Sequence, residues 1–340
     1  MQNIDISKLP PPPPGKTGWP WTESSSNPPA LMDNGSDWPR ISIVTPSYNQ
    51  GQFIEETIRS VLLQGYPNLE YIIIDGASKD DSIQIIKKYE NFLSYWVSEP
   101  DQGQTYAISK GIQHATGSLL NWLNSDDILL PGSLYAIAQS YIRENKTNCV
   151  LCGNAYITSI DGKKIKESIV SDVNPDELIC PTYPPLGGGI QASWFFSNEA
   201  WRTVGGIDLK LNFRMDTDLY IRFNEAGCPF VPVNFPVAAY RTHPDTKTRK
   251  GWKENFAYKK AFYKKELAKV NEKERILYEK RIKRVFFGNY LNSISINDNF
   301  GVRLFKIASA FLGYPNALRS PYQLKRSLKL LFFPPADVTI

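Results

Sequence analysis

The sequence predicts an α/β protein with a mainly parallel central sheet flanked by helices. Short apolar runs rich in β-branched residues alternate with segments whose apolar residues recur at helical spacing. Each connection between successive apolar runs is long enough for the right-handed crossover that parallel strands need. With 42% hydrophobic and 21% charged residues, the composition is that of a globular chain and excludes a disordered one.

The elements are expected in a fixed order from residue 40. The run RISIVTPSYN predicts a strand, 51–64 a helix and LEYIIIDG a second strand. The alternation then repeats, with helices at 80–92 and 104–115 and strands at 93–99 and 118–127. A further helix is expected to begin near Pro131, and the run 147–154, which holds Cys149 and Cys152, reads as a buried strand and not as a zinc site.

Composition divides the chain into three parts. Residues 1–39 are rich in proline and carry no hydrophobic period, which predicts an extended arm on the domain surface. Residues 40–250 are expected to form the main α/β domain. Residues 251–340 are expected to form a basic helical extension, with amphipathic helices over 252–287 and 300–333.

Charge is unevenly distributed along the chain. Residues 1–240 have a net charge of −9 and residues 241–340 one of +14, which argues against nucleic acid as a partner of the acidic body. The basic extension fits an anionic membrane surface, and alternatively a solvated helical face, a cover for the sheet or a homodimer contact. No apolar run of spanning length and no secretory leader are found, so a cytoplasmic protein, peripheral to the inner face of the membrane, is expected.

Polar residues follow the apolar runs, at the sheet edge where open α/β folds bind ligands. These segments are 45–49, 75–78, 99–101 and 124–127, and three of the four contain carboxylates. Neither a GxGxxG turn nor a phosphate-binding GxxxxGK[ST] loop follows the first strand, so a dinucleotide enzyme and a P-loop enzyme are excluded. Converging carboxylates need a counter-ion, and a divalent cation that bridges to a diphosphate provides one.

The ordered series of motifs resembles the family 2 inverting glycosyltransferases, which use nucleotide-sugar donors on a Rossmann-like glycosyltransferase A-type fold. The resemblance runs from about Ile41 to His243. It rests on IVTPSYNQGQFIEETIRSVLLQGYPNLEYIIIDGASKD, SEPDQGQTYAISKGIQHATGSLLNWLNSDD, GIQASWFF, GGID, MDTDLYIR and YRTHP.

The resemblance assigns a donor pocket, in which Asp75 accepts a hydrogen bond from the base or ribose and Lys110 contacts phosphate. The family often has a second acid after that aspartate, where this chain has Gly76; without the family context Asp75 would equally be a turn-forming acid. The donor residues implied are Thr45, Pro46, Tyr48, Asn49, Asp75, Ser78, Asp101, Lys110, Asn124, Ser125 and Asp126.

The segment Asn124-Ser125-Asp126 is similar to the family's D-x-D metal motif with its first acid replaced by an amide. The resemblance implies Asp126 as the ligand of Mn²⁺ or Mg²⁺, Asp127 in reserve and His243 as a third ligand or a phosphate donor. Alternatively, the acid pair caps the following helix and His243 is structural. His114 is expected on the surface.

Inversion needs a general base opposite the leaving nucleotide, and Asp216 matches the family's base position, with Met215 where the family often has glutamate. Asp218 is expected to support the loop or cap the helix. Gln191 and Trp194 match the acceptor side, with core packing as the alternative.

The implied partners are a nucleotide-sugar donor and a glycan or lipid-linked acceptor. The competing hypothesis is a catalytically silent nucleotide-binding scaffold; a nucleotidyltransferase would need a glycine-rich loop that TPSYNQG lacks.

Overall fold

The computed structural model describes residues 6–26, 28–170, 189–247 and 298–332, and separate positions between 263 and 294. The chain divides into two compact units, and the described residues up to 247 belong to the first while those from 263 onward belong to the second. Within these ranges, no helix combines the length and apolar character needed to cross a membrane.

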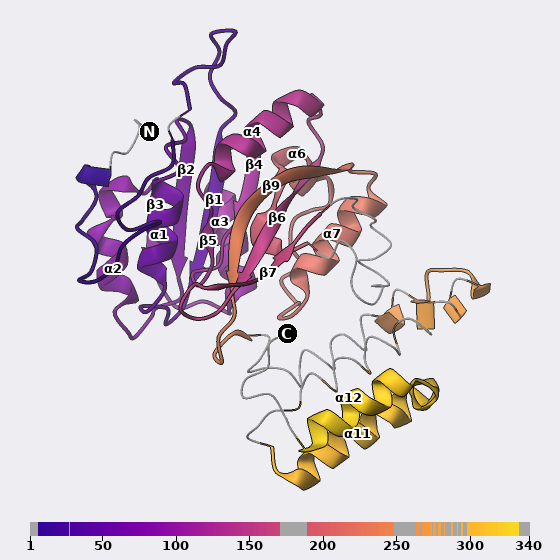
Figure 1. Cartoon of the computed structure of the whole chain (residues 1–340). Coiled ribbons are helices and arrows are strands. Elements are labelled where there is room, and N and C mark those ends of the chain that lie inside the picture. The colour runs from indigo at the N-terminus through magenta and orange to yellow at the C-terminus, as the bar shows by residue number, and fades with distance from the viewer. Residues whose placement is uncertain are drawn as a thin grey trace. The chain divides into compact units, whose positions relative to one another are not determined.

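A nine-stranded sheet forms the centre of the first unit, with strand order β3-β2-β1-β4-β8-β6-β9-β5 and with β7 paired to β6 (Figure 1). The strands are β1 (Ile41–Ser47), β2 (Leu69–Asp75), β3 (Tyr95–Ser98), β4 (Leu119–Trp122), β5 (Ile128–Leu129), β6 (Val150–Thr158), β7 (Lys164–Ser168), β8 (Trp194–Ser197) and β9 (Phe230–Arg241).

The α/β fold class is confirmed. The predicted parallel pairing holds for β1 with β2 and β4, and for β2 with β3. Beyond β4 the sheet is mixed, because β8 runs antiparallel to both β4 and β6, whereas β6 and β9 are parallel. All seven residues of β1 are buried, which explains why its sequence is a continuous apolar run and not an alternating one.

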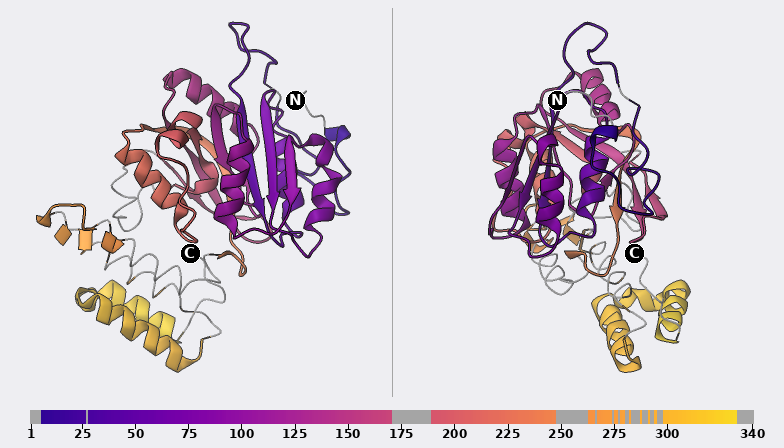
Figure 2. Two further views of the ribbon diagram at one scale, coloured as in Figure 1. Left: turned by 180° about the vertical axis from the view of Figure 1, so that it is seen from behind. Right: turned by 90° about the vertical axis from the view of Figure 1, so that its left-hand side faces the viewer.

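Helices lie on both sides of the sheet (Figure 2). They are α1 (Ile54–Leu62), α2 (Ser82–Lys88), α3 (Gln104–His114), α4 (Ser133–Glu144), α6 (Asn198–Thr203) and α7 (Met215–Glu225), with 3₁₀ turns at Ile6–Lys8, Glu90–Phe92 and Gln191–Ser193. Helix α1 buries Ile54, Ile58 and Val61 at the predicted spacing. Helix α3 approaches β1 so closely that a Cβ atom at Gly111 would lie 2.3 Å from Cγ1 of Val44, so this position requires glycine.

The Cys149–Cys152 run is a buried strand, as predicted. Cys149 precedes β6 and Cys152 lies within it; both are free, fully buried thiols. Cys180 lies outside the described residues.

The N-terminal arm is anchored more firmly than its composition suggests. Leu9, Trp21 and Trp38 are each at most 7% exposed and belong to the core. The fully buried guanidinium of Arg59 in α1 donates to the carbonyls of Pro10, Pro20 and Trp21, at 2.8, 3.0 and 2.8 Å. The arm therefore supplies the hydrogen-bond acceptors that a buried charge on α1 needs.

The second unit contains two neighbouring helices, α11 (Phe300–Gly313) and α12 (Pro321–Phe332), joined through a 3₁₀ turn at Pro315–Arg319. The amphipathic segment expected over 300–333 is thus two helices, broken where Pro315 begins the turn. Most of the helix expected over 252–287 lies outside the described residues. The core of this unit consists of Phe287, Leu291, Ile294, Ile307, Ala310, Ala317 and Leu331.

Candidate active site

A cleft of about 1050 Å³ opens at the carboxyl ends of β1, β2 and β4. The carboxylates that follow separate strands in the sequence meet here, as the topology predicts. The predicted site residues that line the cleft are Pro46, Tyr48, Asp101, Asn124, Ser125, Asp126, Asp127, Gln191 and Asp216. Those outside its lining are Thr45, Asn49, Asp75, Ser78, Lys110, Trp194 and His243.

Asp75, at the end of β2, is fully buried and serves as the centre of a turn. Its Oδ1 accepts a hydrogen bond from Ser78 Oγ at 2.6 Å, and its Oδ2 accepts from Ser78 N at 2.9 Å and Ser98 Oγ at 2.7 Å. Since no part of Asp75 is exposed, the residue shapes the loop that borders the cleft, and a direct bond to a nucleotide would require that loop to move.

Asn49 joins the loops after β1 and β2. Its backbone nitrogen donates to Ser78 Oγ at 2.8 Å, and its Oδ1 accepts from Lys79 N at 2.8 Å. The residue adopts the left-handed region with φ 53°, which asparagine tolerates better than most residues. Thr45 is buried behind the cleft and hydrogen-bonded to the Tyr71 hydroxyl at 3.0 Å. Both residues therefore support the walls of the cleft.

Asp101 occupies the space beside Gly76. A Cβ atom at Gly76 would lie 3.1 Å from Oδ2 of Asp101, and the same carboxylate accepts from Gly103 N at 2.7 Å. The position where the family often carries a second acid is thus next to a carboxylate that comes from the loop after β3.

The loop between β4 and β5 carries Asn124 to Asp127 and is fixed from below by α1. Thr57 Oγ1 donates to the carbonyls of Ser125 and Asp127, at 3.0 and 2.7 Å. Asp127 itself accepts from Arg241 N at 3.0 Å and from Asn124 Nδ2 at 3.3 Å. Burial, and next the charge of Asp126, raise the pKa of Asp127 well above its usual value.

Asp126 contacts a histidine that lies 117 residues later in the sequence. His243 Nε2 lies 3.0 Å from Asp126 Oδ2, and the imidazole, 1% exposed, packs on Phe53 with ring centroids 4.6 Å apart. Two of the three predicted metal-site residues, Asp126 and His243, are therefore hydrogen-bonded to each other.

The three residues of the predicted metal set, Asp126, Asp127 and His243, do not form a preassembled ligand cluster in the described structure. In the part of the chain that the structure describes, no group of three or more His, Cys, Asp or Glu side chains is placed to hold a metal ion. Although Asp127 borders the cleft, it is only 1% exposed and its oxygens accept the two bonds above, so it is a structural residue. Asp126 remains, with its Oδ2 engaged by His243.

Asp216 reaches the cleft from the first turn of α7, where a carboxylate is favoured by the helix dipole. Arg214, at the N-cap in the left-handed region with φ 58°, sets the direction in which that turn begins. Asp218 lies in the same turn but pairs with Arg222 at 2.8 Å, and so supports the helix. Met215, where the family often has glutamate, is 8% exposed.

Three cationic residues that the motifs did not indicate line the cleft: Lys79, Arg214 and Lys247. Lys247 Nζ donates to Gln104 Oε1 at 3.2 Å, and Gln104 Nε2 donates in turn to Asn124 Oδ1 at 2.7 Å. Desolvation lowers the pKa of Lys247, while the nearby charge of Asp216 opposes this. Lys247 lies four residues after His243 and outside the quoted motifs, so no sequence signal separates it from other lysines.

Lys110 does not take the predicted place at the cleft. It lies on α3 and forms an ion pair with Glu99. In this arrangement Lys110 is engaged by Glu99 and does not line the cleft. The cations that the cleft presents to a diphosphate are the three named above.

The two predicted acceptor residues differ in their surroundings. Gln191 lines the cleft, where its Nε2 donates to Trp122 O at 2.6 Å and its buried Oε1 has no hydrogen-bond partner among the described residues. Trp194 is 1% exposed and packs on Tyr220 and Phe230, with centroids 4.5 and 5.9 Å apart. Gln191 can meet a ligand hydroxyl, whereas Trp194 is core.

Comparison with known proteins agrees with this geometry. Residues 42–204 match the family model described as glycosyl transferase family 2. The chain carries a family 2 glycosyltransferase domain. It is similar to an uncharacterized glycosyltransferase of Mycobacterium tuberculosis (41% identity over 90 residues, 26% of this chain and 34% of the relative). It is also similar to the putative teichuronic acid biosynthesis glycosyltransferase TuaG of Bacillus subtilis (36% over 96 residues, 27% and 38%). The chain spans about a third to three fifths of the length of such curated relatives.

Solved structures support the fold of the glycosyltransferase domain. Residues 1–349 of S. aureus TarS, crystallised in complex with UDP, superpose with a TM-score of 0.54 at 14% identity, over 86% of this chain and 89% of that one. The likeness shows that the fold is of the glycosyltransferase A type.

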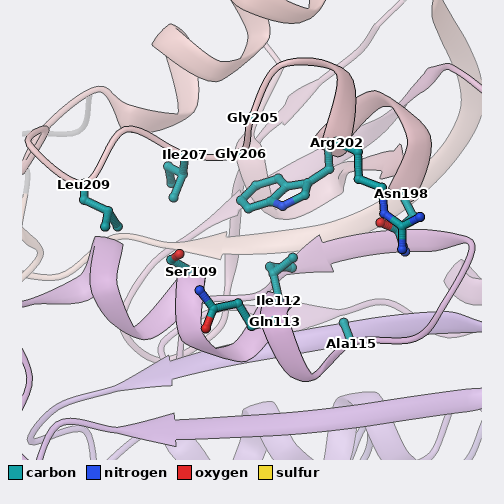
Figure 3. Close-up of a pocket in the computed structure, with 11 residues that line it drawn as sticks. Ser109, Ile112, Gln113, Ala115, Asn198, Arg202, Gly205, Gly206, Ile207 and Leu209 are labelled. Atoms are coloured by element: carbon teal, nitrogen blue, oxygen red, sulfur yellow. The ribbon is translucent and has the colours of Figure 1, made fainter.

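The glycosyltransferase domain has a second, smaller hollow of about 390 Å³ between α3 and the segment from α6 to Leu209 (Figure 3). Arg202 and Asn198 lie at one end of it and Leu209 at the other. Because none of the described residues that line this hollow is a carboxylate or a histidine, the cleft at the strand ends, which has both Asp126 and Asp216, is the candidate active site.

Proposed function

We propose that this protein transfers a sugar, with inversion, from a nucleoside diphosphate sugar to a hydroxyl of a glycan or lipid-linked acceptor in polysaccharide biosynthesis. The placement of Asp126 and Asp216 on one cleft at the strand ends carries the proposal. The cleft provides a carboxylate for the donor side and a second, from another element, for the acceptor side.

Asp216 is the proposed general base. The acceptor oxygen attacks the anomeric carbon while its proton passes to the Asp216 carboxylate, and the bond from that carbon to the diphosphate oxygen breaks with both electrons going to the leaving nucleotide. A single displacement of this kind inverts the anomeric centre. Gln191 lines the cleft, and its side-chain amide is the proposed partner of a sugar hydroxyl.

Charge that develops on the departing diphosphate needs cations. Lys79, Arg214 and Lys247 line the cleft and supply positive charge directly. Asp126, whose carboxylate lines the cleft, could bind a divalent cation that arrives with the nucleotide. Mg²⁺ and Mn²⁺ are often held by one or two carboxylates together with substrate phosphates. When bound, Mn²⁺ or Mg²⁺ neutralises phosphate charge, and Asp126 would hold it while His243 orients Asp126.

Tyr48 is 62% exposed at the edge of the cleft and offers a ring on which a nucleobase can stack. UDP is the first nucleotide to test, since the TarS structures contain UDP or UDP-GlcNAc. Calorimetric titration of UDP, GDP and dTDP, each with Mn²⁺ and then with EDTA, identifies the nucleotide and the metal requirement. Binding that is unaffected by EDTA would remove Asp126 from the proposed metal role.

Substitution of the base tests catalysis. Asp216→Asn should lower kcat by roughly 10²- to 10⁴-fold with nucleotide affinity retained. Asp161→Asn, an exposed position in the β6–β7 hairpin, is the matched control and should leave both unchanged. A wild-type protein that binds nucleotide but consumes no donor sugar, with any acceptor or with water, would instead support a nucleotide-binding scaffold.

A further inference from the structure

Helix α11 exposes an apolar side to solvent. Leu304, Phe305 and Leu312 lie on one face at helical spacing, and Phe305 and Leu312 are 70% and 82% exposed. An ordinary surface helix places such residues inward and its charges outward. The exposure of these side chains therefore needs an explanation.

The two charged residues of α11, Arg303 and Lys306, are directed away from this apolar face. Lys306 pairs with Asp298 at 2.7 Å. Arg303 donates to the carbonyls of Asp298 and Leu331, at 2.7 and 3.1 Å. Both cations are thus directed to neighbouring backbone and to the preceding acid, and the outward side keeps only apolar and small residues.

Helix α12 continues the pattern. Leu324, Leu328 and Phe332, four residues apart, form an exposed apolar row, and Lys325 and Lys329 form an exposed basic row beside it. The Phe300 and Phe332 rings are 6.1 Å apart, so the apolar rows of the two helices meet. The apolar face consists of Phe300, Leu304, Phe305, Leu312, Leu324, Leu328 and Phe332.

Charge selects the partner of this face. Residues 299–332 contain six lysines and arginines and no acidic residue. A symmetric contact with the same face of a second copy would bring like charges together, whereas an anionic lipid surface complements them. At 1.5 Å per residue, 14-residue α11 is only about 21 Å long, shorter than the roughly 30 Å hydrocarbon core, so the helix suits the plane of the interface.

We propose that the apolar face of α11 and α12 docks on the surface of an anionic lipid bilayer. The leucine and phenylalanine side chains enter the boundary of the acyl chains, and Lys325 and Lys329 remain at the level of the phosphates. This attachment does not depend on the proposed glycosyltransferase reaction, and it would hold the enzyme at a membrane surface.

The test is co-sedimentation of the full chain with phosphatidylcholine vesicles, with and without phosphatidylglycerol, over a range of salt. Binding is expected to require the anionic lipid and to weaken with salt. Phe305→Gln/Leu312→Gln and Lys325→Gln/Lys329→Gln should each weaken binding about tenfold or more, since they remove apolar area and charge, respectively.

Matched controls separate this face from general surface effects. Ile160→Gln/Ile165→Gln removes two exposed apolar residues of the first unit, and Lys87→Gln/Lys88→Gln removes two exposed lysines of α2. Neither should change vesicle binding. The proposal is overturned if wild-type protein binds neither vesicle, if the controls weaken binding as much as the test variants, or if Phe305→Gln/Leu312→Gln instead dissolves a dimer of the wild type.

Discussion

His243 Nε2 lies 3.0 Å from Asp126 Oδ2, a contact between residues 117 positions apart in the chain. The imidazole is 1% exposed, whereas the Asp126 side chain is 17% exposed, so the bond lies at the buried side of the carboxylate. The hydrogen bond fixes Oδ2 of Asp126, a predicted metal ligand whose carboxylate lines the cleft. His243 is thus a positioning residue for Asp126.

Replacing His243 should lower catalytic efficiency through Asp126. His243→Leu removes the donor and is expected to reduce kcat/KM for the donor sugar roughly 10- to 100-fold, with a raised requirement for Mn²⁺. His243→Gln keeps an amide N–H near the Nε2 position and should restore part of the loss. His114→Gln is the control, because His114 is exposed and only stacks on Tyr95. Equal losses in the Leu and Gln variants would contradict the positioning role.

Lys247 should react with an amine reagent faster than an ordinary lysine. Desolvation lowers the pKa of Lys247 below the usual 10.5. At a pH below 10.5, a larger fraction of Lys247 than of an ordinary lysine is therefore the neutral, reactive amine. Limited acetylation at mildly alkaline pH, read by peptide mass spectrometry, is expected to modify Lys247 several-fold faster than Lys110, which is ion-paired with Glu99. A bound nucleoside diphosphate should protect Lys247, and not Lys110, from acetylation. If Lys110 is protected equally, the assignment of Lys110 to a position outside the cleft is contradicted.

Loss of the Arg59 guanidinium should release the N-terminal arm. Arg59→Met leaves the carbonyls of Pro10, Pro20 and Trp21 without their donor in a buried place, which is expected to cost at least about 3 kcal/mol in the free energy of unfolding. Urea titration followed by tryptophan fluorescence measures it, since Trp21 lies 5.6 Å from the guanidinium.

The control for Arg59 is Arg143→Met. Arg143 is exposed, with a side chain 68% accessible, and its substitution should change the free energy of unfolding by no more than about 0.5 kcal/mol. If the two substitutions cost the same, the arm is not held through Arg59.

The cysteine pair should be inert in the folded protein. Burial, and next the charge of Glu144, raise the pKa of Cys149 to about 11, and burial also raises the pKa of Cys152 well above its usual value. At neutral pH neither is a thiolate, so iodoacetamide is expected to alkylate them only after unfolding in urea. Peptide mass spectrometry distinguishes the two states, and rapid labelling in the native state would refute the buried strand.

Sequence patterns predicted the parallel part of the sheet and the meeting of carboxylates at its edge because β1, β2 and β4 are buried, regular strands with crossover helices. They did not predict β9, whose Pro232 and Pro236 are atypical of a strand interior. The structure accommodates Pro236 at a bulge, where the register to β6 shifts around Asn154.

Side-chain direction was the part of the site that patterns could not supply. Lys110 and Lys247 are both lysines near donor motifs, yet the first turns to Glu99 and the second enters the cleft. Asp126 and Asp127 are neighbours of the same type, and only the bonds from Arg241 and Asn124 reveal which of them is structural. Two of these contacts, Arg241 with Asp127 and Lys247 with Gln104, join residues more than a hundred positions apart, which patterns in one segment do not reveal.

The link between Asp126 and His243 also orders events during translation. The ribosome releases the parallel block of β1 to β4 early, while Asp126 must wait for 117 further residues before its histidine emerges. Strand β5 waits similarly, because Ile128 pairs with Ala239 of β9. A nascent chain stalled before β9 would therefore hold Asp126 without its histidine partner and β5 without the strand with which it pairs.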